Sequence, residues 1–338
     1  MQRRAAFLRM LSKARISRRG QGLSLKSDPQ TSAKAIETMS IAHGTILGGL
    51  STVPNLQAAL RGYRDCLGFE VVETGAVPRD LAASWGCAGN DGSPYAVMRP
   101  ASGAPCGLRL VEQPDHADFK PSRTYGWAAF ECTVADVWQW PDVVEAAGFQ
   151  IVGPPKILEN IEPAFIPMQV LGTGREMVYL NQVLGDLPQI DLPRAQAPVD
   201  RIFIVVLATP DRKASLDYYR DAIGLEPGED FTLPYAMINE AFGLPEDTLT
   251  TISMVQNGRM PIIEVDDYPD TATARARHDG LLPPGNALVT LAVRDLDACK
   301  VDWITPPRVR KGALYAGRRA ATTIGLGDEL IECVEVAE

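Results

Sequence analysis

The chain repeats itself once, and this repeat limits the folds it can adopt more than any other feature. Residues 63–65 (YRD) and 68–70 (GFE) recur as residues 219–221 (YRD) and 224–226 (GLE), an offset of 156. Near the ends of the two halves, residues 174–178 (GREMV) correspond to residues 327–331 (GDELI). Since the offset drifts by only a few residues, we interpret the halves as a duplication.

Each half opens with the same local pattern. The short β-branched runs 46–53 and 202–207 predict strands. Each is followed by a turn whose side chain, Asn55 or Asp211, is suited to cap a helix. The following segments, 56–67 and 213–223, have apolar residues at helical spacing, and each ends at a glycine suited to a left-handed C-cap.

The same plan begins again inside each half. A second strand, turn and helix is predicted from residues 128–133 and again from residues 287–293, with Asp136 and Asp295 at the turns. Further strands follow each helix. The sequence therefore predicts a βαβββ module twice in each half and four times in the chain.

This pattern resembles the vicinal oxygen chelate superfamily, which includes glyoxalase I, extradiol dioxygenases and bleomycin-binding proteins. The resemblance rests on the Asp or Asn turn and on the Tyr-Arg-Asp-x-x-Gly helix ending, and it covers residues 41–338. It implies an α+β fold of four βαβββ modules that form two glyoxalase-like domains with curved mixed sheets. We expect the first domain at 41–186, a Pro-rich linker at 187–198 and the second domain at 199–338.

The first 40 residues differ in composition. Residues 1–38 hold nine Lys or Arg against two acidic residues, a charge of +7. We expect a basic, disordered extension in a cytoplasmic protein. The alternative is an amphipathic surface-binding arm or an organelle-targeting peptide.

Charge and composition exclude several classes of protein. The net charge of −9 disfavours a general nucleic-acid binder, because such proteins neutralise phosphates. No apolar run is long enough for a membrane helix, so we expect no integral membrane contact. The six cysteines form no CxxC pair, which favours free thiols over a disulfide framework or a zinc site.

The resemblance implies a metal site in each domain, with a histidine on the first strand of each module and a glutamate on a later strand. These positions fall on Gly48, Arg109, Ala129 and Tyr179 in the first half, and none of them is a family-type ligand. In the second half the histidine positions fall on Ile204 and Leu288, whereas the acidic positions hold Glu264 and Glu332.

Glu264 and Glu332 are therefore the candidate catalytic residues. If both point into one cup, they can hold a divalent metal ion with water, or they can divide the roles of general acid and base. Two carboxylates held close together would also have different pKa values. The alternative is that they remain from an ancestral site and pair with arginines or face solvent. A divalent metal ion as cofactor and no cofactor both stay open.

Five further residues are candidates for substrate binding. Arg109 and Tyr179 would bind an anionic or carbonyl group, although Arg109 fits equally well in a salt bridge with Glu131. Trp127 belongs to an aromatic group with Tyr125, Trp138 and Trp140, which forms either core packing or a wall for a planar ligand. Trp85 and Phe242 lie in inserted segments, 80–90 and 237–246, that we expect to cover the cup.

The sequence thus favours a vicinal-oxygen-chelate-type enzyme, a lyase, isomerase or related activity. Its substrate would be a small, oxygen-bearing and aromatic molecule in the cup of the second domain. Ring-cleaving dioxygenation is disfavoured because the two histidines are missing. The alternative is a metal-free binding or sequestering protein of the bleomycin-resistance type. A structural protein without an active cup and a homodimer also stay open.

Overall fold

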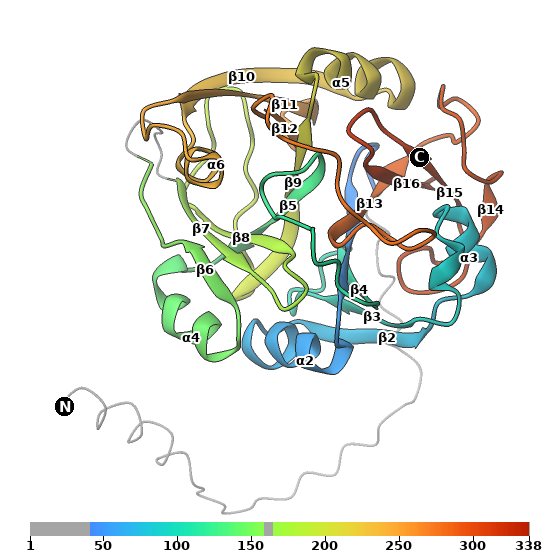
Figure 1. Ribbon diagram of the computed structural model, residues 1–338. Helices are drawn as coiled ribbons and strands as arrows, with labels where there is room; N and C mark the ends of the chain where they lie inside the picture. The colour runs from blue at the N-terminus through green and yellow to red at the C-terminus, as the bar shows by residue number, and fades with distance from the viewer. Residues whose placement is uncertain (1–40, 159–164, 338) are drawn as a thin grey trace, which may run out of the picture. The chain divides into compact units, whose positions relative to one another are not determined.

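The protein is described by a computed structural model that covers residues 41–158 and 165–337. The expected basic extension, residues 1–40, lies outside the described residues. Two eight-stranded mixed sheets make up the fold, with short helices against them (Figure 1). The predicted α+β class and the glyoxalase-like architecture are confirmed.

The first sheet has the strand order β14-β15-β16-β13-β1-β4-β3-β2. Its strands are β1 (Ile46–Val53), β2 (Glu70–Ala76), β3 (Pro94–Arg99), β4 (Gly107–Glu112), β13 (Gly285–Val293), β14 (Arg308–Val309), β15 (Arg319–Ile324) and β16 (Leu330–Glu335).

The second sheet has the order β10-β11-β12-β9-β5-β8-β7-β6. Its strands are β5 (Gly126–Val134), β6 (Gln150–Gly153), β7 (Phe165–Leu171), β8 (Met177–Val183), β9 (Val199–Thr209), β10 (Glu226–Pro234), β11 (Leu249–Asn257) and β12 (Met260–Asp267).

Each sheet combines one module from each half of the chain. The first module pairs with the fourth through the antiparallel strands β1 and β13. The second module pairs with the third through β5 and β9. A sheet is therefore completed only when both halves are present. The division of the chain into domains at 187–198 stays a prediction, because the sheets do not follow it.

The helices predicted after the first strands are confirmed. Helix α2 (Leu56–Leu60) continues as the π-helix η1 (Arg61–Cys66), and Asn55 accepts a hydrogen bond from the Ala58 N–H at 2.8 Å. Helix α5 (Arg212–Tyr218) continues as η4 (Tyr219–Ile223), and Asp211 accepts from the Ala214 N–H at 2.9 Å. The glycines that end both segments have left-handed φ angles, which favour glycine.

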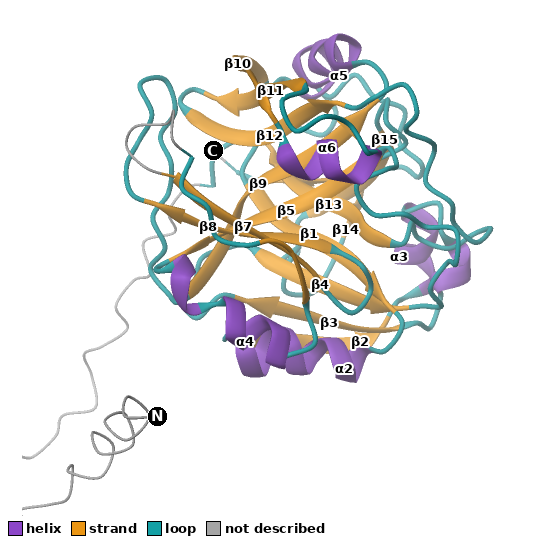
Figure 2. Ribbon diagram, turned by 60° about the vertical axis from the view of Figure 1, so that its left-hand side comes forward, coloured by secondary structure: helices purple, strands orange, loops and turns teal. Residues whose placement is uncertain are grey.

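The later helices are shorter and less regular. The second module has the 3-10 turn η3 (Val137–Gln139) and α4 (Pro141–Ala146), and α4 lies beside α2 in both views (Figure 1 and Figure 2). In the fourth module, residues 294–307 are all described and form turns instead of the expected helix. This segment is short, contains β-branched residues and ends in two prolines, which disfavour a helix.

The inserted segments are helical rather than loops. Residues 79–84 form α3 (Arg79–Ser84), which is followed by the short 3-10 helix η2 (Ala88–Asn90). Residues 236–242 form α6 (Ala236–Phe242). Within the described part of the chain, no helix is long and apolar enough to span a membrane.

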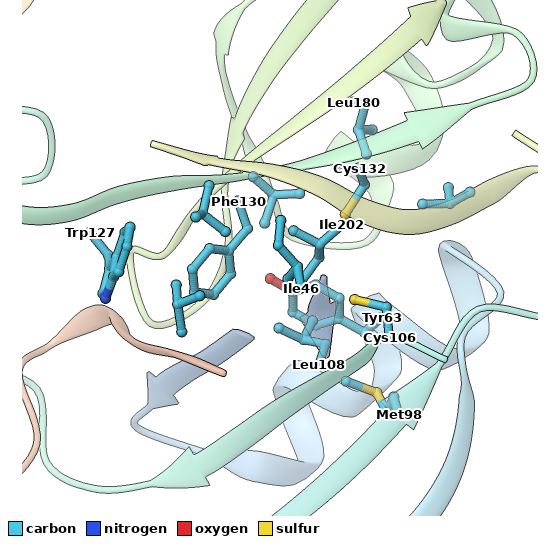
Figure 3. Close-up of a cluster of buried hydrophobic side chains, with 14 of the residues drawn as sticks. Ile46, Tyr63, Met98, Cys106, Leu108, Trp127, Phe130, Cys132, Leu180 and Ile202 are labelled. Carbon is cyan, nitrogen blue, oxygen red and sulfur yellow. The ribbon is translucent and has the colours of Figure 1, made fainter. Parts of the chain in front are cut away.

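A shared hydrophobic core lies between the two sheets (Figure 3). It includes Leu108 of the first sheet, Phe130 and Leu180 of the second, and Tyr63 of η1. The Phe130 ring lies so close to Gly49 on β1 that a Cβ there would be only 2.5 Å from it. The close approach at Gly49 is therefore a contact between the two sheets.

Two buried hydrogen bonds connect the repeated motifs to each other. The Tyr63 hydroxyl donates to Glu176, just before β8, at 2.8 Å, and the Tyr219 hydroxyl donates to Glu329, just before β16, at 2.9 Å. The second oxygen of each glutamate accepts the backbone N–H of the residue two positions earlier. Each bond joins a helix packed on one sheet to a strand of the other sheet.

Both glutamates lie at most 1 % exposed to solvent. Burial is the main cause that raises the pKa of each carboxyl to about 7, against an ordinary value of 4.5, although the hydrogen bonds lower it in part. The folded state therefore binds more protons than the unfolded state between these two values.

This difference predicts that stability falls as the pH rises. Raised folded-state pKa values contribute stability that is complete below pH 4.5 and is lost as the pH rises through about 7. Each glutamate should lower the free energy of unfolding by about 1.4 kcal/mol per pH unit in this window. Urea denaturation at several pH values, followed by tryptophan fluorescence, measures the slope.

The double variant Glu176→Gln/Glu329→Gln is the matched comparison, because glutamine does not titrate. Its free energy of unfolding should fall less steeply between pH 5 and pH 7 than that of the parent protein, whatever its absolute stability. Equal slopes would show that these two carboxyls do not have raised pKa values.

Candidate functional site

The pairing of the modules decides which candidate residues share a site. Arg109 on β4 and Glu332 on β16 belong to the first sheet, and we call the face that carries them the first cup. Tyr179 on β8 and Glu264 on β12 belong to the second sheet, and we call their face the second cup.

The expected pair of Glu264 and Glu332 is therefore not formed. The two carboxylates lie on different sheets, and the structure does not bring them together. The expectation treated each half of the chain as one cup. It failed because the third module pairs with the second and the fourth module with the first.

In the first cup, the buried carboxyl of Glu332 accepts hydrogen bonds from three side chains. It is 1 % exposed and accepts hydrogen bonds from the Trp85 indole at 3.1 Å, the Tyr315 hydroxyl at 2.8 Å and the Thr290 hydroxyl at 2.8 Å. The carboxylate therefore makes its hydrogen bonds to side chains of the protein itself.

Arg109 supplies the positive charge of the same network. Its guanidinium donates to the Tyr315 hydroxyl at 3.0 Å and lies about 5 Å from the centres of the Trp85 and Tyr315 rings. The alternative salt bridge between Arg109 and Glu131 is wrong, because Glu131 lies on the second sheet and bonds Asn181. Arg109 is 2 % exposed, is linked to Glu332 through the Tyr315 hydroxyl, and has no hydrogen-bond partner for Nε and Nη1 among the described residues.

Apolar side chains fill the rest of the first cup. Helix α3 contributes Leu81 and Ala82, Trp85 follows it, and Leu314 comes from the segment before β15. Trp85, a candidate ligand contact, is 1 % exposed and is part of this packing. The inserted segment thus lies inside the first cup.

The aromatic group of the first half does not form one wall. Trp127 is buried in the shared core, where its indole N–H donates to the Leu330 carbonyl at 2.8 Å. Trp140 is also in that core, whereas Trp138 is 54 % exposed. The core-packing alternative holds for Trp127 and Trp140.

The second cup contains a cavity of about 370 Å³. Its wall is mostly apolar and includes Phe165, Ile204, Phe231, Leu233, Ile252 and Met254. Ala236 and Met237 of α6 line it as well, and Figure 1 shows α6 within the curve of the second sheet.

Polar groups meet at one part of this cavity. The Tyr235 hydroxyl donates to Glu264 at 3.2 Å and lies 3.1 Å from the Tyr179 hydroxyl. Tyr179 also donates to the sulfur of Met237 at 3.1 Å. Of the sequence-predicted residues, the structure brings together Tyr179 and Glu264. Phe242 lies nearby on α6, packed edge-on against Tyr268.

Glu131 is a cavity residue that the sequence reasoning missed as a ligand contact. It pairs with Tyr179 across β5 and β8 and with Ile204 across β5 and β9. It is 3 % exposed, lines the cavity, and accepts from the Asn181 amide through its Oε2 atom at 2.5 Å. The sequence feature that could have identified Glu131 is its position as a charged residue in the middle of the apolar run AAFECTV.

The strand register explains why it was missed. The residues beside the four acidic positions are Leu50, Glu131, Val206 and Thr290. Counting back from the turns placed the first-strand positions two residues too early in every module. The error is the same in all four modules, so it lies in the assumed distance from the turn and not in an irregularity of one strand.

Three carboxyl groups of the second cup have raised pKa values. Burial raises the pKa of Glu131 and Asp266, and the nearby Glu264 raises both further. Burial also raises the pKa of Glu264, although hydrogen bonds with Asp266 and Tyr235 lower it in part. Neither carboxyl oxygen of Asp266 has a hydrogen-bond partner among the described residues.

These residues do not fit a family-type metal site. The four corresponding positions of the second cup hold two carboxyls, a phenol and a valine, without an imidazole. Across residues 41–158 and 165–337, no three His, Cys, Asp or Glu side chains are grouped to hold a metal ion.

Comparison with known proteins agrees with this architecture. Residues 42–157 match the model of the Glyoxalase/Bleomycin resistance protein/Dioxygenase superfamily. This match covers about a third of the chain and supports the resemblance to the superfamily. Among curated proteins, none matches the chain in sequence.

Solved structures of the superfamily share the fold over most of the chain. Glyoxalase I from Zea mays superposes with a TM-score of 0.56 at 15% identity, over 86% of this chain and 92% of its own. A putative dioxygenase from Bacillus subtilis superposes with a TM-score of 0.54 at 12% identity, over 87% and 85%. Identities this low show a common fold and leave the reaction open.

The network of the first cup predicts a strong coupling between Arg109 and Glu332. Glu332→Leu should lower the free energy of unfolding by about 3–5 kcal/mol, because it leaves Arg109 buried without a counter-charge. The double variant Arg109→Met/Glu332→Leu should lose clearly less than the sum of the two single variants. Urea denaturation of the four proteins measures the coupling, and strictly additive losses would contradict it.

Proposed function

We propose that this protein binds a small, ring-containing organic molecule in the second cup, without a family-type metal ion. The observation that carries the proposal is the cavity of about 370 Å³, whose wall is mostly apolar and meets a few polar groups. Ligand sites of proteins have this construction and begin near 300 Å³.

The cavity volume limits the size of the ligand. An apolar cavity of about 150 Å³ holds one benzene ring. The second cup therefore accommodates a molecule of about two fused rings. Phe165, Phe231 and the aliphatic side chains around them favour a flat apolar body over a sugar or a nucleotide.

The polar part of the wall orients the ligand. Glu264 retains some accessible surface although it lies inside the cup, and it lines the cavity. Together with Tyr235 and Glu131 it offers hydrogen bonds at one part of an otherwise apolar space. A ligand with one polar substituent on its ring system satisfies this pattern.

A second candidate is an enzyme that transfers a proton, such as an isomerase or lyase. It is favoured by one observation, two carboxyls with raised pKa values two residues apart on β12, Glu264 and Asp266, of which Glu264 accepts a hydrogen bond from the Tyr235 hydroxyl. Carboxyls with pKa values raised by burial are suited to general acid and base catalysis near neutral pH. This enzyme would use the same ligand class as the binding protein.

The binding proposal predicts saturable uptake of 2-naphthylmethanol, which has two fused rings and one hydroxyl. Its size gives a Kd on the order of 100 μM. Ile204→Trp should abolish binding, because the indole fills the cavity that Ile204 lines. Isothermal titration calorimetry measures binding, and recovery of unchanged 2-naphthylmethanol separates binding from turnover.

Leu249→Trp is the matched control, since Leu249 lies on β11 of the same sheet and is 62 % exposed. It should bind 2-naphthylmethanol as the parent protein does. Equal binding by Ile204→Trp would place the ligand outside the second cup and overturn the proposal.

A further inference from the structure

Apart from the Gln169 amide, the polar groups that line the second cup away from solvent are acidic or phenolic. Glu131, Glu264, Tyr179 and Tyr235 line the cavity from β5, β12, β8 and the segment before α6. Lys156 is the cation among the described lining residues, and its side chain is exposed to solvent. Among the described residues, the buried part of the wall therefore has acceptors for a positive charge and no cation for a negative one.

One of these acceptors, Glu131, has an oxygen atom that accepts no hydrogen bond from the described residues. Glu131 is 3 % exposed and lies against the cavity. Among the described residues its one donor is Asn181, and that bond involves Oε2 alone. The other oxygen, Oε1, remains available to a group inside the cavity. A buried carboxylate with an unused oxygen is costly unless a donor arrives with the ligand.

Glu264, the second acidic group of the cavity, also favours a hydrogen-bond donor on the ligand. Burial is the main cause of the raised pKa of Glu131, and the charge of the nearby Glu264 raises it further. A protonated amine placed beside them would replace this repulsion with charge-assisted hydrogen bonds. A carboxylate or phosphate on the ligand would instead increase the repulsion.

We propose that the ligand of the second cup carries a protonated amine on its ring system, held by Glu131 and Glu264. This inference rests on the proposed binding function and names the polar group of its ligand. The apolar wall takes the rings, and the two carboxylates take the ammonium group. The cup thus selects cationic over neutral and anionic molecules of equal shape.

Three probes of one shape test the selection: 2-naphthylmethylamine, 2-naphthylmethanol and 2-naphthoic acid. Calorimetry of the whole protein at pH 7 should show at least tenfold tighter binding of the amine than of the alcohol, and no binding of the acid. In Glu131→Gln/Glu264→Gln the amine should lose this advantage while the alcohol still binds, which shows that the cup is folded. Glu229→Gln, an exposed change on β10, should leave all three results unchanged.

The outcomes separate the two proposals. If the alcohol binds as tightly as the amine to the parent protein, the inference about the amine is wrong and the binding function stands. If the amine advantage persists in the double variant, the carboxylates do not hold the ammonium group and the inference is again wrong. If none of the three probes binds, the proposed binding function itself fails.

Discussion

The hydrogen bonds from Tyr63 to Glu176 and from Tyr219 to Glu329 are the constraint on which the rest of the structure depends. Each fixes the helix of one module against a strand of the module that follows it in the chain, and those two modules belong to different sheets. Together with the core between the sheets, the bonds make the four modules one cooperative unit. The two sheets therefore cannot separate without exposing two buried carboxyls.

The two cups differ in how far side chains fill them. The first cup is filled by α3 and Trp85, and Arg109 and Glu332 are linked there through the Tyr315 hydroxyl, although two nitrogens of Arg109 have no partner among the described residues. The second cup encloses a cavity, and its carboxyls are only partly compensated. An unfilled apolar space reduces stability, so the cavity of the second cup favours a role in binding.

The sequence predicted the fold well because the repeat, the capped turns and the terminal glycines are local signals. It did not predict that Tyr63 meets Glu176, although both motifs were visible, since a contact between distant segments leaves no local pattern. The prediction that Glu264 and Glu332 share one site was wrong for the same reason, because tertiary contacts decide which modules pair. Glu131 was missed because the count back from the turn ended two residues too early, whereas Tyr179 and Glu264 do both line the second cup.

The central claim is that the second cup is open to ligand and the first is closed. A crystal structure of the protein grown with 2-naphthylmethanol tests it most directly. The account predicts electron density for the two rings among Ile204, Phe231 and Met254, with the hydroxyl within hydrogen-bond distance of Glu264 or Glu131. Density beside Arg109 and Glu332, with Trp85 displaced and the second cup empty, would contradict it.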